Sequence, residues 1–351
     1  MTAVVTGSAP HPTPTKTERV LVTGAAGFVG YHLVSRLLAA GAAIHGLDNL
    51  NAYYDVGLKE ARLAEIGPNP RFAFSRLDLT DYDGLAALFA AFRPQAVVHL
   101  AAQAGVRYSL TNPRAYASAN VDGFLSVLEA CRTHPVRHLV YASSSSVYGA
   151  NSKVPYHEDD AVLAPVSLYA ATKRANELMA QAYAHLYGIA CSGARFFTVY
   201  GPWGRPDMAY YSFTKAILEG RTIDVFNHGK MQRDFTYIDD VVEALVRLID
   251  LPPTARPAHD AEGSRPGGAA PHTLYNIGNH TPITLERFIA TIEAALGREA
   301  SKRYLPMQPG EVLATYADVE RLSRATGFAP RTPIEEGMAR FVAWFRAYHR
   351  C

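Results

Sequence analysis

Cysteine is scarce in this 351-residue sequence, which contains only three of them. Cys131, Cys191 and Cys351 lie far apart and form no Cys-x-x-Cys pair, which excludes a disulfide-rich scaffold and a thiolate zinc site. The thirteen histidines form no His-Glu-x-x-His arrangement, so no metal site is predicted. This pattern indicates a protein of the reducing cytoplasm.

Long apolar runs and an excess of one charge are also absent. No stretch approaches the roughly 18 consecutive apolar residues of a membrane-spanning helix, and the N-terminus lacks the charged start and apolar core of a secretory signal. The 34 Lys and Arg nearly balance the 32 Asp and Glu, so neither nucleic acid nor a membrane is a predicted partner. We interpret residues 1–17 as a disordered leader.

The sequence does contain a regular alternation of short apolar runs and segments with helical spacing. Strands are predicted at residues 19–23, 43–47, 72–76, 96–100, 138–142 and 190–196, and helices at 28–40, 82–92, 116–131 and 168–187. This alternation predicts an α/β fold with a Rossmann-type doubly wound parallel sheet. Ligands of such folds bind at the carboxyl ends of the strands.

After the sixth predicted strand the alternation becomes irregular, which predicts a smaller C-terminal α/β lobe. We assign residues 18–198 to a dinucleotide-binding domain, with about 230–250 returning to it, and 199–351 mainly to a substrate-binding lobe. Within that lobe, residues 284–296 and 333–348 have the spacing of amphipathic helices. Residues 252–271 are rich in Pro, Ala, Gly and charge, which predicts a mobile surface loop.

A glycine-rich turn joins the first strand to the first helix, which opens at Phe28. Gly24, Gly27 and Gly30 permit a tight turn and a close approach of the backbone to a pyrophosphate, which the helix N-terminus faces. Asp48 ends the second strand, where a carboxylate can bind both ribose hydroxyls and would repel a 2′-phosphate. The pattern predicts NAD rather than NADP; an ordinary glycine turn and a strand-end aspartate are the alternative interpretation.

Further candidate cofactor contacts follow the ends of the next strands. They are Asn49 after the second strand, Asp78 and Leu79 after the third, and Leu100, Ala101, Ala102 and Gln103 after the fourth. The small residues of the last group would let a flat ring approach the backbone. Taken alone, the same residues are also typical of strand-end packing.

Tyr169 and Lys173 form a Tyr-x-x-x-Lys pair, which a helix places on one face. The pair opens the helix that follows the fifth strand of the predicted dinucleotide fold. A phenol has an ordinary pKa near 10, but a neighbouring ammonium and a cationic nicotinamide would favour the phenolate. Tyr169 is therefore a candidate to exchange a proton with a substrate hydroxyl while hydride passes to the nicotinamide.

These motifs resemble those of extended short-chain dehydrogenases/reductases, and the likeness runs from about Arg19 to the end of the chain. The resemblance implies that Ser144 shares a hydrogen bond with the reacting hydroxyl. It also implies that Lys173 holds the nicotinamide ribose. A strand-end serine that caps the backbone is the alternative interpretation of Ser144.

The residues after the fifth strand distinguish reactions within this family. Sugar 4,6-dehydratases typically have Thr-Asp-Glu here, and UDP-glucuronate decarboxylases have a similar acidic residue, whereas this sequence has Ser144, Ser145 and Ser146. Without that carboxylic acid, elimination of water lacks its proton donor. The resemblance therefore favours a simple epimerase, which oxidises carbon 4 of a UDP-sugar and returns the hydride to the other face.

Residues 195–208 resemble the corresponding segment of UDP-glucuronate 4-epimerases. Thr198 stands where many neutral-sugar epimerases have Asn, and Arg205 could bind a carboxylate. The 4-keto form of glucuronate is a β-keto acid, so we hypothesise that Thr198, Arg205 and residues 144–146 hold its carboxylate out of alignment with the carbonyl. A surface ion pair is the alternative interpretation of Arg205.

The resemblance also implies contacts with the nucleotide. Arg233 matches the family position that binds the diphosphate, and Val225 and Phe226 are candidates for a uracil pocket, although such a pair is also typical of a core. Gln308 stands where many relatives have a second diphosphate-binding Arg. Arg107 and Ser109 are candidates to reach the sugar or are plain loop residues.

Relatives of this kind often dimerise through the helices at 116–131 and 168–187, so a homodimer is expected. The alternative activities are a UDP-glucose or UDP-N-acetylhexosamine 4-epimerase and then a UDP-glucuronate decarboxylase. A non-catalytic NAD-binding regulator is the alternative of another class. That class predicts decay of the catalytic residues, whereas Ser144, Tyr169 and Lys173 are all present.

Overall fold

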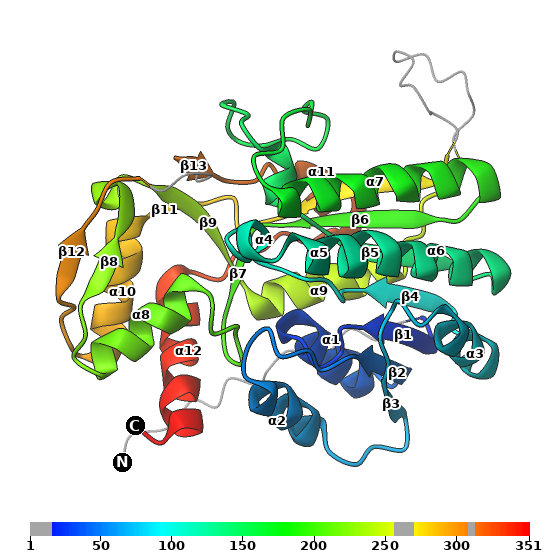
Figure 1. Cartoon of the computed structure of the whole chain (residues 1–351), viewed down its shortest axis with the longest axis horizontal. Helices are drawn as coiled ribbons and strands as arrows, with labels where there is room; N and C mark the ends of the chain where they lie inside the picture. The colour runs from blue at the N-terminus through cyan, green and yellow to red at the C-terminus, as the bar shows by residue number, and fades with distance from the viewer. Residues whose placement is uncertain (1–15, 256–269, 308–312) are drawn as a thin grey trace.

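The structure, a computed structural model, describes residues 16–255, 270–307 and 313–351, which form two lobes (Figure 1). Residues 1–15 of the predicted leader and most of the predicted loop at 252–271 lie outside these ranges. Lys16 N and Thr17 Oγ1 donate hydrogen bonds to Asp250, 2.9 and 2.6 Å long, and Thr17 is buried. These two residues therefore belong to the folded part of the chain.

The larger lobe contains a seven-stranded parallel sheet. In spatial order its strands are β3 (Phe72–Arg76), β2 (Ala43–Asp48), β1 (Arg19–Thr23), β4 (Ala96–His99), β5 (His138–Ser144), β6 (Cys191–Phe196) and β10 (His272–Ile277). The winding of the chain reverses between β1 and β4, which is where such folds bind ligands. The predicted doubly wound parallel sheet is confirmed.

Helices cover both faces of this sheet, so its central strands are buried at almost every position. One face packs against α1 (Phe28–Ala39) and α9 (Ile238–Ile249), and the other against α3 (Tyr82–Phe92), α6 (Gly123–Thr133) and α7 (Leu168–Tyr187). The α9 helix lies within the segment predicted to return to this domain. The return of β10 was not predicted, because an apolar run does not reveal which sheet it joins.

Some elements of the larger lobe differ from the sequence prediction. The helix predicted at 116–131 comprises α5 (Pro113–Tyr116), a π-helical turn η1 (Ala117–Asp122) and α6. An additional helix, α2 (Val56–Ile66), follows β2. It was not predicted because its buried residues include the basic Lys59 and Arg62, which give it no apolar face to recognise.

The smaller lobe lies to the left in Figure 1 and is built from two small sheets and three helices. In the first sheet β9 (Gln232–Tyr237) pairs with β7 (Thr198–Tyr200), β11 (Pro282–Thr284) and β13 (Ala314–Thr315); in the second β8 (Ile223–Val225) pairs with β12 (Lys302–Tyr304). The helices are α8 (Ala209–Leu218), α10 (Leu285–Leu296) and α12 (Ile334–His349). The predicted C-terminal α/β lobe is therefore present.

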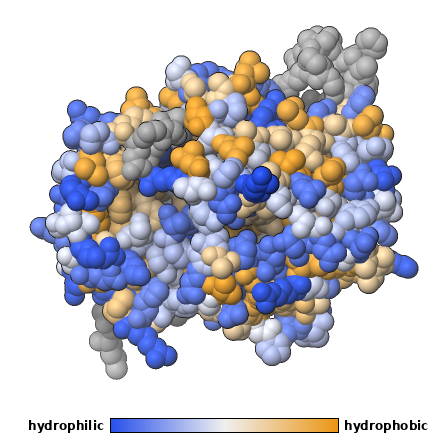
Figure 2. All heavy atoms as spheres, viewed as in Figure 1, coloured by the Kyte–Doolittle hydropathy of each residue, from blue (hydrophilic) through white to orange (hydrophobic). Residues whose placement is uncertain are grey.

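One hydrophobic core joins the two lobes, since it runs from α1 and α9 into the side chains of α8, α10 and α12. The short elements α4 (Tyr108–Thr111), η2 (Ser145–Tyr148), η3 (Phe226–Gly229) and α11 (Glu320–Thr326) complete the fold. Hydrophobic and hydrophilic residues intermingle over the face shown in Figure 2. The lobes are thus packed together over a shared interior.

The structure also bears on three sequence features: apolar helices, metal-binding side chains and cysteines. Within the described ranges, no helix combines the length and apolar composition that crossing a bilayer requires. Among the same residues, no group of three or more His, Cys, Asp or Glu side chains could hold a metal ion. Cys131 and Cys191 are buried free thiols, and Cys351 is an exposed one.

Candidate active site

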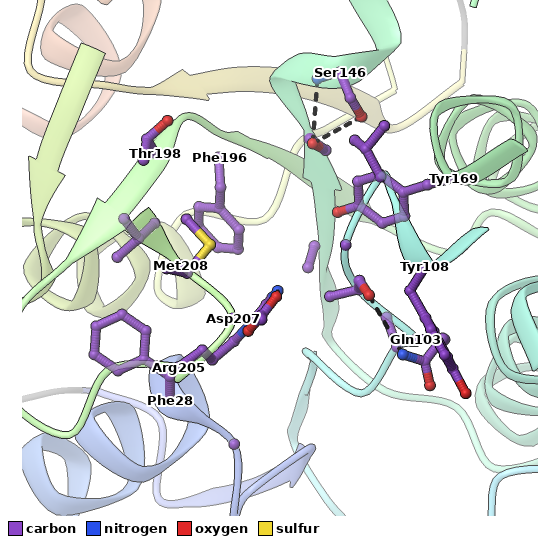
Figure 3. A pocket seen from close by; sticks show the side chains of 18 of the residues that line it. Phe28, Gln103, Tyr108, Ser146, Tyr169, Phe196, Thr198, Arg205, Asp207 and Met208 are labelled. Atoms are coloured by element: carbon purple, nitrogen blue, oxygen red, sulfur yellow. Dashed lines mark hydrogen bonds and ion pairs between the residues drawn. The ribbon is translucent and has the colours of Figure 1, made fainter. Parts of the chain in front are cut away.

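A continuous cavity of about 1170 Å³ lies at the carboxyl ends of the large sheet and extends into the smaller lobe. In Figure 3, Tyr169 and Ser146 lie on one side of it, Thr198 and Met208 on the other, and Arg205 projects between them. The cavity is lined by these predicted site residues: Gly24, Gly27, Phe28, Gly30, Asp48, Asn49, Asp78, Leu79, Leu100, Ala101, Ala102, Gln103, Arg107, Ser144, Ser145, Ser146, Tyr169, Lys173, Thr198, Arg205, Phe226 and Arg233.

The glycine cradle, residues 24–30, lies between β1 and α1. Gly24 has a φ of +73°, and a Cβ there would lie 2.7 Å from Ala101 N, so no other residue fits without displacing backbone. A Cβ on Gly30 would lie 2.0 Å from Gly24 O. Among the described residues no side chain caps the N-terminus of α1 at Gly27, so its N–H groups can bind an anion. The cradle therefore fits a dinucleotide pyrophosphate.

Asp48 lies at the end of β2, where the sequence predicted a ribose-binding carboxylate. Its Oδ1 accepts a hydrogen bond of 2.8 Å from Leu50 N. Lys59 of α2, which is buried, lies 3.5 Å from the same oxygen and 3.2 Å from Asn51 Oδ1. The carboxylate thus has a nearby cation that the sequence analysis did not identify.

Asn49 and Asp78 join the ends of β2 and β3. Asn49 Nδ2 donates a hydrogen bond of 2.7 Å to Asp78 Oδ2, and Asp78 Oδ1 accepts from the backbone and hydroxyl of Thr80. Burial alone would raise the pKa of Asp78, but these hydrogen bonds outweigh it and the pKa is lowered. Asp78 is therefore a charged group that shapes the loop at the cavity wall.

The loop after β4 is held by the π-helical turn. Asn120 accepts a hydrogen bond of 2.7 Å from Gln103 N and donates to Gln103 O and to Thr172 of α7. Asn176 of α7 donates in turn to Asn120 O. Inserting a π turn places Asn120 between the loop and α7, which is a common use of such turns at functional sites.

Tyr169 and Lys173 lie one helical turn apart on α7 and face the end of β5. Lys173 Nζ donates a hydrogen bond of 2.9 Å to Ala142 O, and the hydroxyl of Ser144 interacts with that of Tyr169. Ser144 Oγ also accepts from the backbone N and the hydroxyl of Ser146. The structure therefore brings together the three residues predicted to act in catalysis.

The charges around this group differ from the sequence-based expectation. Burial raises the pKa of Tyr169, against the opposing effects of the Ser144 hydrogen bond and the charge of Arg205. Burial also lowers the pKa of Lys173, to about 8, so part of its positive charge is lost near neutral pH. The predicted phenolate thus depends on positive charge beyond that of Lys173, which a bound nicotinamide would add.

A buried ion pair fixes the position of α7. Arg195 of β6 donates two hydrogen bonds to Glu177 of α7, with lengths of 2.8 and 2.9 Å, and both side chains are 1% exposed. Glu177 also accepts from Ser143, the neighbour of Ser144, and from Arg174. Burial raises the pKa of Glu177, but the bonds from Arg195 outweigh this effect and the pKa is lowered, so the carboxylate is charged.

Arg205 projects into the cavity from the loop after β7. It forms a two-bond ion pair with Asp207, in which the shorter N–O distance is 2.6 Å, and Tyr53 donates to the same carboxylate at 3.1 Å. Its side chain is 22% exposed. The alternative of an ion pair is thus realised, but it lies in the cavity wall rather than on the outer surface.

The smaller lobe contributes Arg233 and Phe226. Arg233 Nη1 donates a hydrogen bond of 2.9 Å to Gln232 O, and the guanidinium of Arg107 lies 5.4 Å from the centre of the Phe226 ring. Val225 is not part of the cavity wall, because strand alternation directs it into the core.

One other predicted contact is not brought to the cavity. Ser109 is buried, and its hydroxyl donates to Val106 O within the loop, which is its plain loop role. Gln308 lies outside the described residues.

Several lining residues were not predicted. Tyr53, Tyr54, Asn51 and Lys59 come from the segment after β2, and Asp207 and Met208 follow Arg205. The sequence feature that could have revealed the first four is the run of aromatic and polar residues directly after Asp48, at the end of a strand. Asp207 lies within the segment that resembles epimerases, but the sequence predicts no role for it.

The glycine cradle, the carboxylate of Asp48 and the Tyr169–Lys173 pair line one cavity. Together they define a dinucleotide-binding protein with a Tyr-x-x-x-Lys pair in its site. Residues 20–262 match the model of the NAD dependent epimerase/dehydratase family, and the chain belongs to that family.

Two relatives and one solved structure resemble nearly the whole chain. Protein CapI of Staphylococcus aureus is 50% identical, covering 95% of this chain and 99% of its own length. A probable UDP-glucuronate 4-epimerase of Rhizobium meliloti is 46% identical, covering 95% and 98%. The UDP-glucuronic acid 4-epimerase of Bacillus cereus, solved with UDP-glucuronic acid and NAD, is 31% identical with a TM-score of 0.84, covering 94% and 99%.

The lowered pKa of Lys173 predicts a pH dependence of NAD binding. Its ammonium is present below pH 8 and is lost as the pH rises through about 8. Because we assign this ammonium to the nicotinamide ribose, the affinity for NAD should fall by up to about tenfold per pH unit above that value. Calorimetric titration between pH 6.5 and 9.5 measures this, with Lys173→Met as the variant that lacks the dependence. Equal wild-type affinity at pH 7 and 9.5 would contradict the assignment.

Proposed function

We propose that this protein is an NAD-dependent UDP-glucuronate 4-epimerase, which interconverts UDP-glucuronate and UDP-galacturonate. The observation that carries the proposal is the continuous cavity, which is lined by a dinucleotide cradle, by Tyr169 beside Ser144, and by Thr198 and Arg205. The names of the Rhizobium meliloti and Bacillus cereus relatives support the same activity.

The residues around the cradle bind the cofactor. Residues 24–30 hold its pyrophosphate at the N-terminus of α1, and Asp48 accepts hydrogen bonds from a ribose. Lys173 holds the ribose next to the reacting ring. When bound, NAD supplies the group that accepts a hydride from carbon 4 of the sugar and gives it back.

Tyr169 moves the proton of the reaction. As a phenolate it takes the proton from the hydroxyl at carbon 4 while the hydrogen on that carbon leaves as hydride, so the sugar loses one proton and one hydride and becomes a ketone. Ser144 hydrogen-bonds to the reacting oxygen and to Tyr169. After the keto-sugar turns over, Tyr169 returns the proton to the oxygen as hydride adds to the other face, which inverts carbon 4.

Thr198, Arg205 and the serines at 144–146 recognise the sugar carboxylate. The intermediate is a β-keto acid, and it loses carbon dioxide only when the breaking bond aligns with the carbonyl π system. Arg205 is already paired with Asp207, so its charge is partly balanced before the sugar binds. We infer that Arg205 orients the carboxylate by its fixed donors rather than by a large net charge.

The smaller lobe binds the nucleotide in this proposal. Arg233 lines the cavity from β9 and binds the diphosphate. Phe226, under the guanidinium of Arg107, forms an aromatic wall for the uracil. Contacts from both lobes would thus hold the substrate across the opening between them.

A homodimer and a cytoplasmic location belong to the same proposal. The helices expected to dimerise, α6 and α7, expose large apolar side chains: Leu125, Leu178, Leu186 and Tyr187. A second copy packed against these helices would cover them. The free thiols of Cys131, Cys191 and Cys351 support a reducing compartment.

A substrate comparison tests the activity. We expect the protein, incubated with UDP-glucuronate without added reductant, to form UDP-galacturonate of unchanged mass, and to convert UDP-glucose and UDP-N-acetylglucosamine far more slowly. Chromatographic separation of the epimers with mass measurement reads the outcome.

The same assay distinguishes the alternatives. Preferred turnover of a neutral sugar would favour a UDP-hexose 4-epimerase, and loss of carbon dioxide as the main reaction would favour a decarboxylase. No turnover of any of the three by NAD-loaded protein would favour a regulator.

Replacing Arg205 tests how the carboxylate is held. Arg205→Ala removes charge-assisted hydrogen bonds worth about 1.5–3 kcal/mol, so KM for UDP-glucuronate should rise about 10- to 100-fold. We also expect a UDP-pentose among the products, because the carboxylate is less restrained. Arg221→Ala, which removes an exposed arginine paired with Glu219 outside the cavity, is the control. Unchanged kinetics and no pentose in the Arg205 variant would refute the role.

A further inference from the structure

Arg62 of α2 is a buried cation that the proposed reaction does not use. Its side chain is 0% exposed. Its donors bond to Ala26 O at 2.9 Å, to the Tyr54 hydroxyl at 2.7 Å, to Trp203 O at 2.6 and 3.1 Å, and to Gly204 O at 3.4 Å. All these acceptors are neutral, and no described carboxylate forms an ion pair with Arg62.

Burying a guanidinium without an opposite charge is costly even when its donors are satisfied. Part of its role is structural, because an apolar side chain here would leave the carbonyl oxygens of Ala26 and Trp203 without these donors. The position of Arg62 suggests another reason for it. Ala26 lies inside the glycine cradle, so the guanidinium is one hydrogen bond away from the segment that fits a dinucleotide pyrophosphate.

The other bonds of Arg62 reach the segment that precedes Arg205. Trp203 has a φ of +61°, an unfavourable conformation for a residue with a side chain, and two donors of Arg62 hold its carbonyl. Gly204 is required next to it, because a Cβ there would lie 2.2 Å from the Tyr210 hydroxyl. That hydroxyl accepts a hydrogen bond from Arg205 N.

A second side chain from the dinucleotide domain holds the same segment. His32 of α1 lies 2.9 Å from Pro202 O through Nε2. Burial lowers the pKa of His32 to about 4, so the ring is neutral at pH 7 and Nε2 carries the hydrogen that Pro202 O accepts. Residues 202–205 are therefore attached to the cofactor-binding half of the molecule by two side chains.

We propose that Arg62 is a positioning residue that couples the glycine cradle to residues 202–205. One rigid guanidinium fixes the backbone on both sides, and its charge gains a counter-ion when a dinucleotide pyrophosphate occupies the cradle. Cofactor binding thereby stabilises the conformation of the segment that carries Arg205. The part of this proposal that concerns the sugar carboxylate rests on the proposed function; the coupling itself does not.

The planar guanidinium of Arg62 makes two contributions that substitutions can separate: its positive charge, and the hydrogen bonds that attach residues 202–205 to the cradle. A lysine at this position would keep the positive charge but has a single nitrogen, which cannot bond to Ala26 O and to both carbonyls of the segment with the same geometry. A methionine would keep much of the side-chain volume but would lose both the positive charge and the hydrogen-bond donors. Charge and attachment can therefore be separated with Arg62→Lys and Arg62→Met.

The test measures NAD affinity by calorimetry and amide hydrogen exchange of residues 202–208 with and without NAD. In the wild type, NAD should slow exchange in this segment. Arg62→Met should bind NAD at least about tenfold more weakly and lose the protection at NAD saturation. Arg62→Lys should retain most of the affinity and also lose the protection. Arg36→Met, which removes an arginine of α1 paired with Glu243, controls for general destabilisation.

Wild-type exchange that is unaffected by saturating NAD would overturn the coupling, whether or not the variants fold. Equal NAD affinity in Arg62→Met, Arg36→Met and the wild type would also overturn the assigned role. As a further readout, the Arg62 variants should release more UDP-pentose than the wild type although Arg205 is intact. If the wild type forms no epimer, the proposed function fails, while affinity and exchange still decide the coupling.

Discussion

The buried ion pair between Glu177 and Arg195 is the interaction on which the site depends. It joins α7 to β6, and the hydrogen bond from Ser143 extends the same contact to the end of β5. Separating Glu177 from Arg195 would leave a buried charge without its partner, which is costly. This cost keeps α7 from shifting along the sheet. Lys173, one turn away, bonds to Ala142 O of the same strand. These contacts fix the position of α7 along the sheet, and Tyr169 therefore lies within hydrogen-bonding reach of Ser144.

The opposite wall of the cavity is held by the dinucleotide-binding half of the protein. Arg62 and His32 fix residues 202–205, and Tyr53 and Asp207 fix the guanidinium of Arg205. The smaller lobe adds Arg233 and Phe226, and its core is continuous with that of the larger lobe. The site is thus built from α7, from the segment at 202–205 and from the smaller lobe. Each of these holds its own binding groups in position, and the space between them would let the sugar turn over.

Much of the fold could be predicted from the sequence, because the strands are nearly continuous apolar runs and the helices have clear periodicity. Gly24, Asp48, Tyr169 and Lys173 could be located because their chemistry depends on strand ends and helix spacing. The sequence could not reveal α2, whose buried residues are basic, nor the return of β10 across a long connection. The pairing of Arg205 with Asp207 likewise depends on side-chain geometry that spacing does not determine.

In the reaction described above, one hydride leaves carbon 4 and returns to the same carbon before the sugar is released. UDP-glucuronate carrying deuterium at carbon 4 tests it directly, with the isotope content of UDP-galacturonate read by mass spectrometry and NMR. We expect the deuterium to be retained at carbon 4 of the product in ordinary water. Loss of the deuterium to solvent would contradict it, because the hydrogen would then have left as a proton.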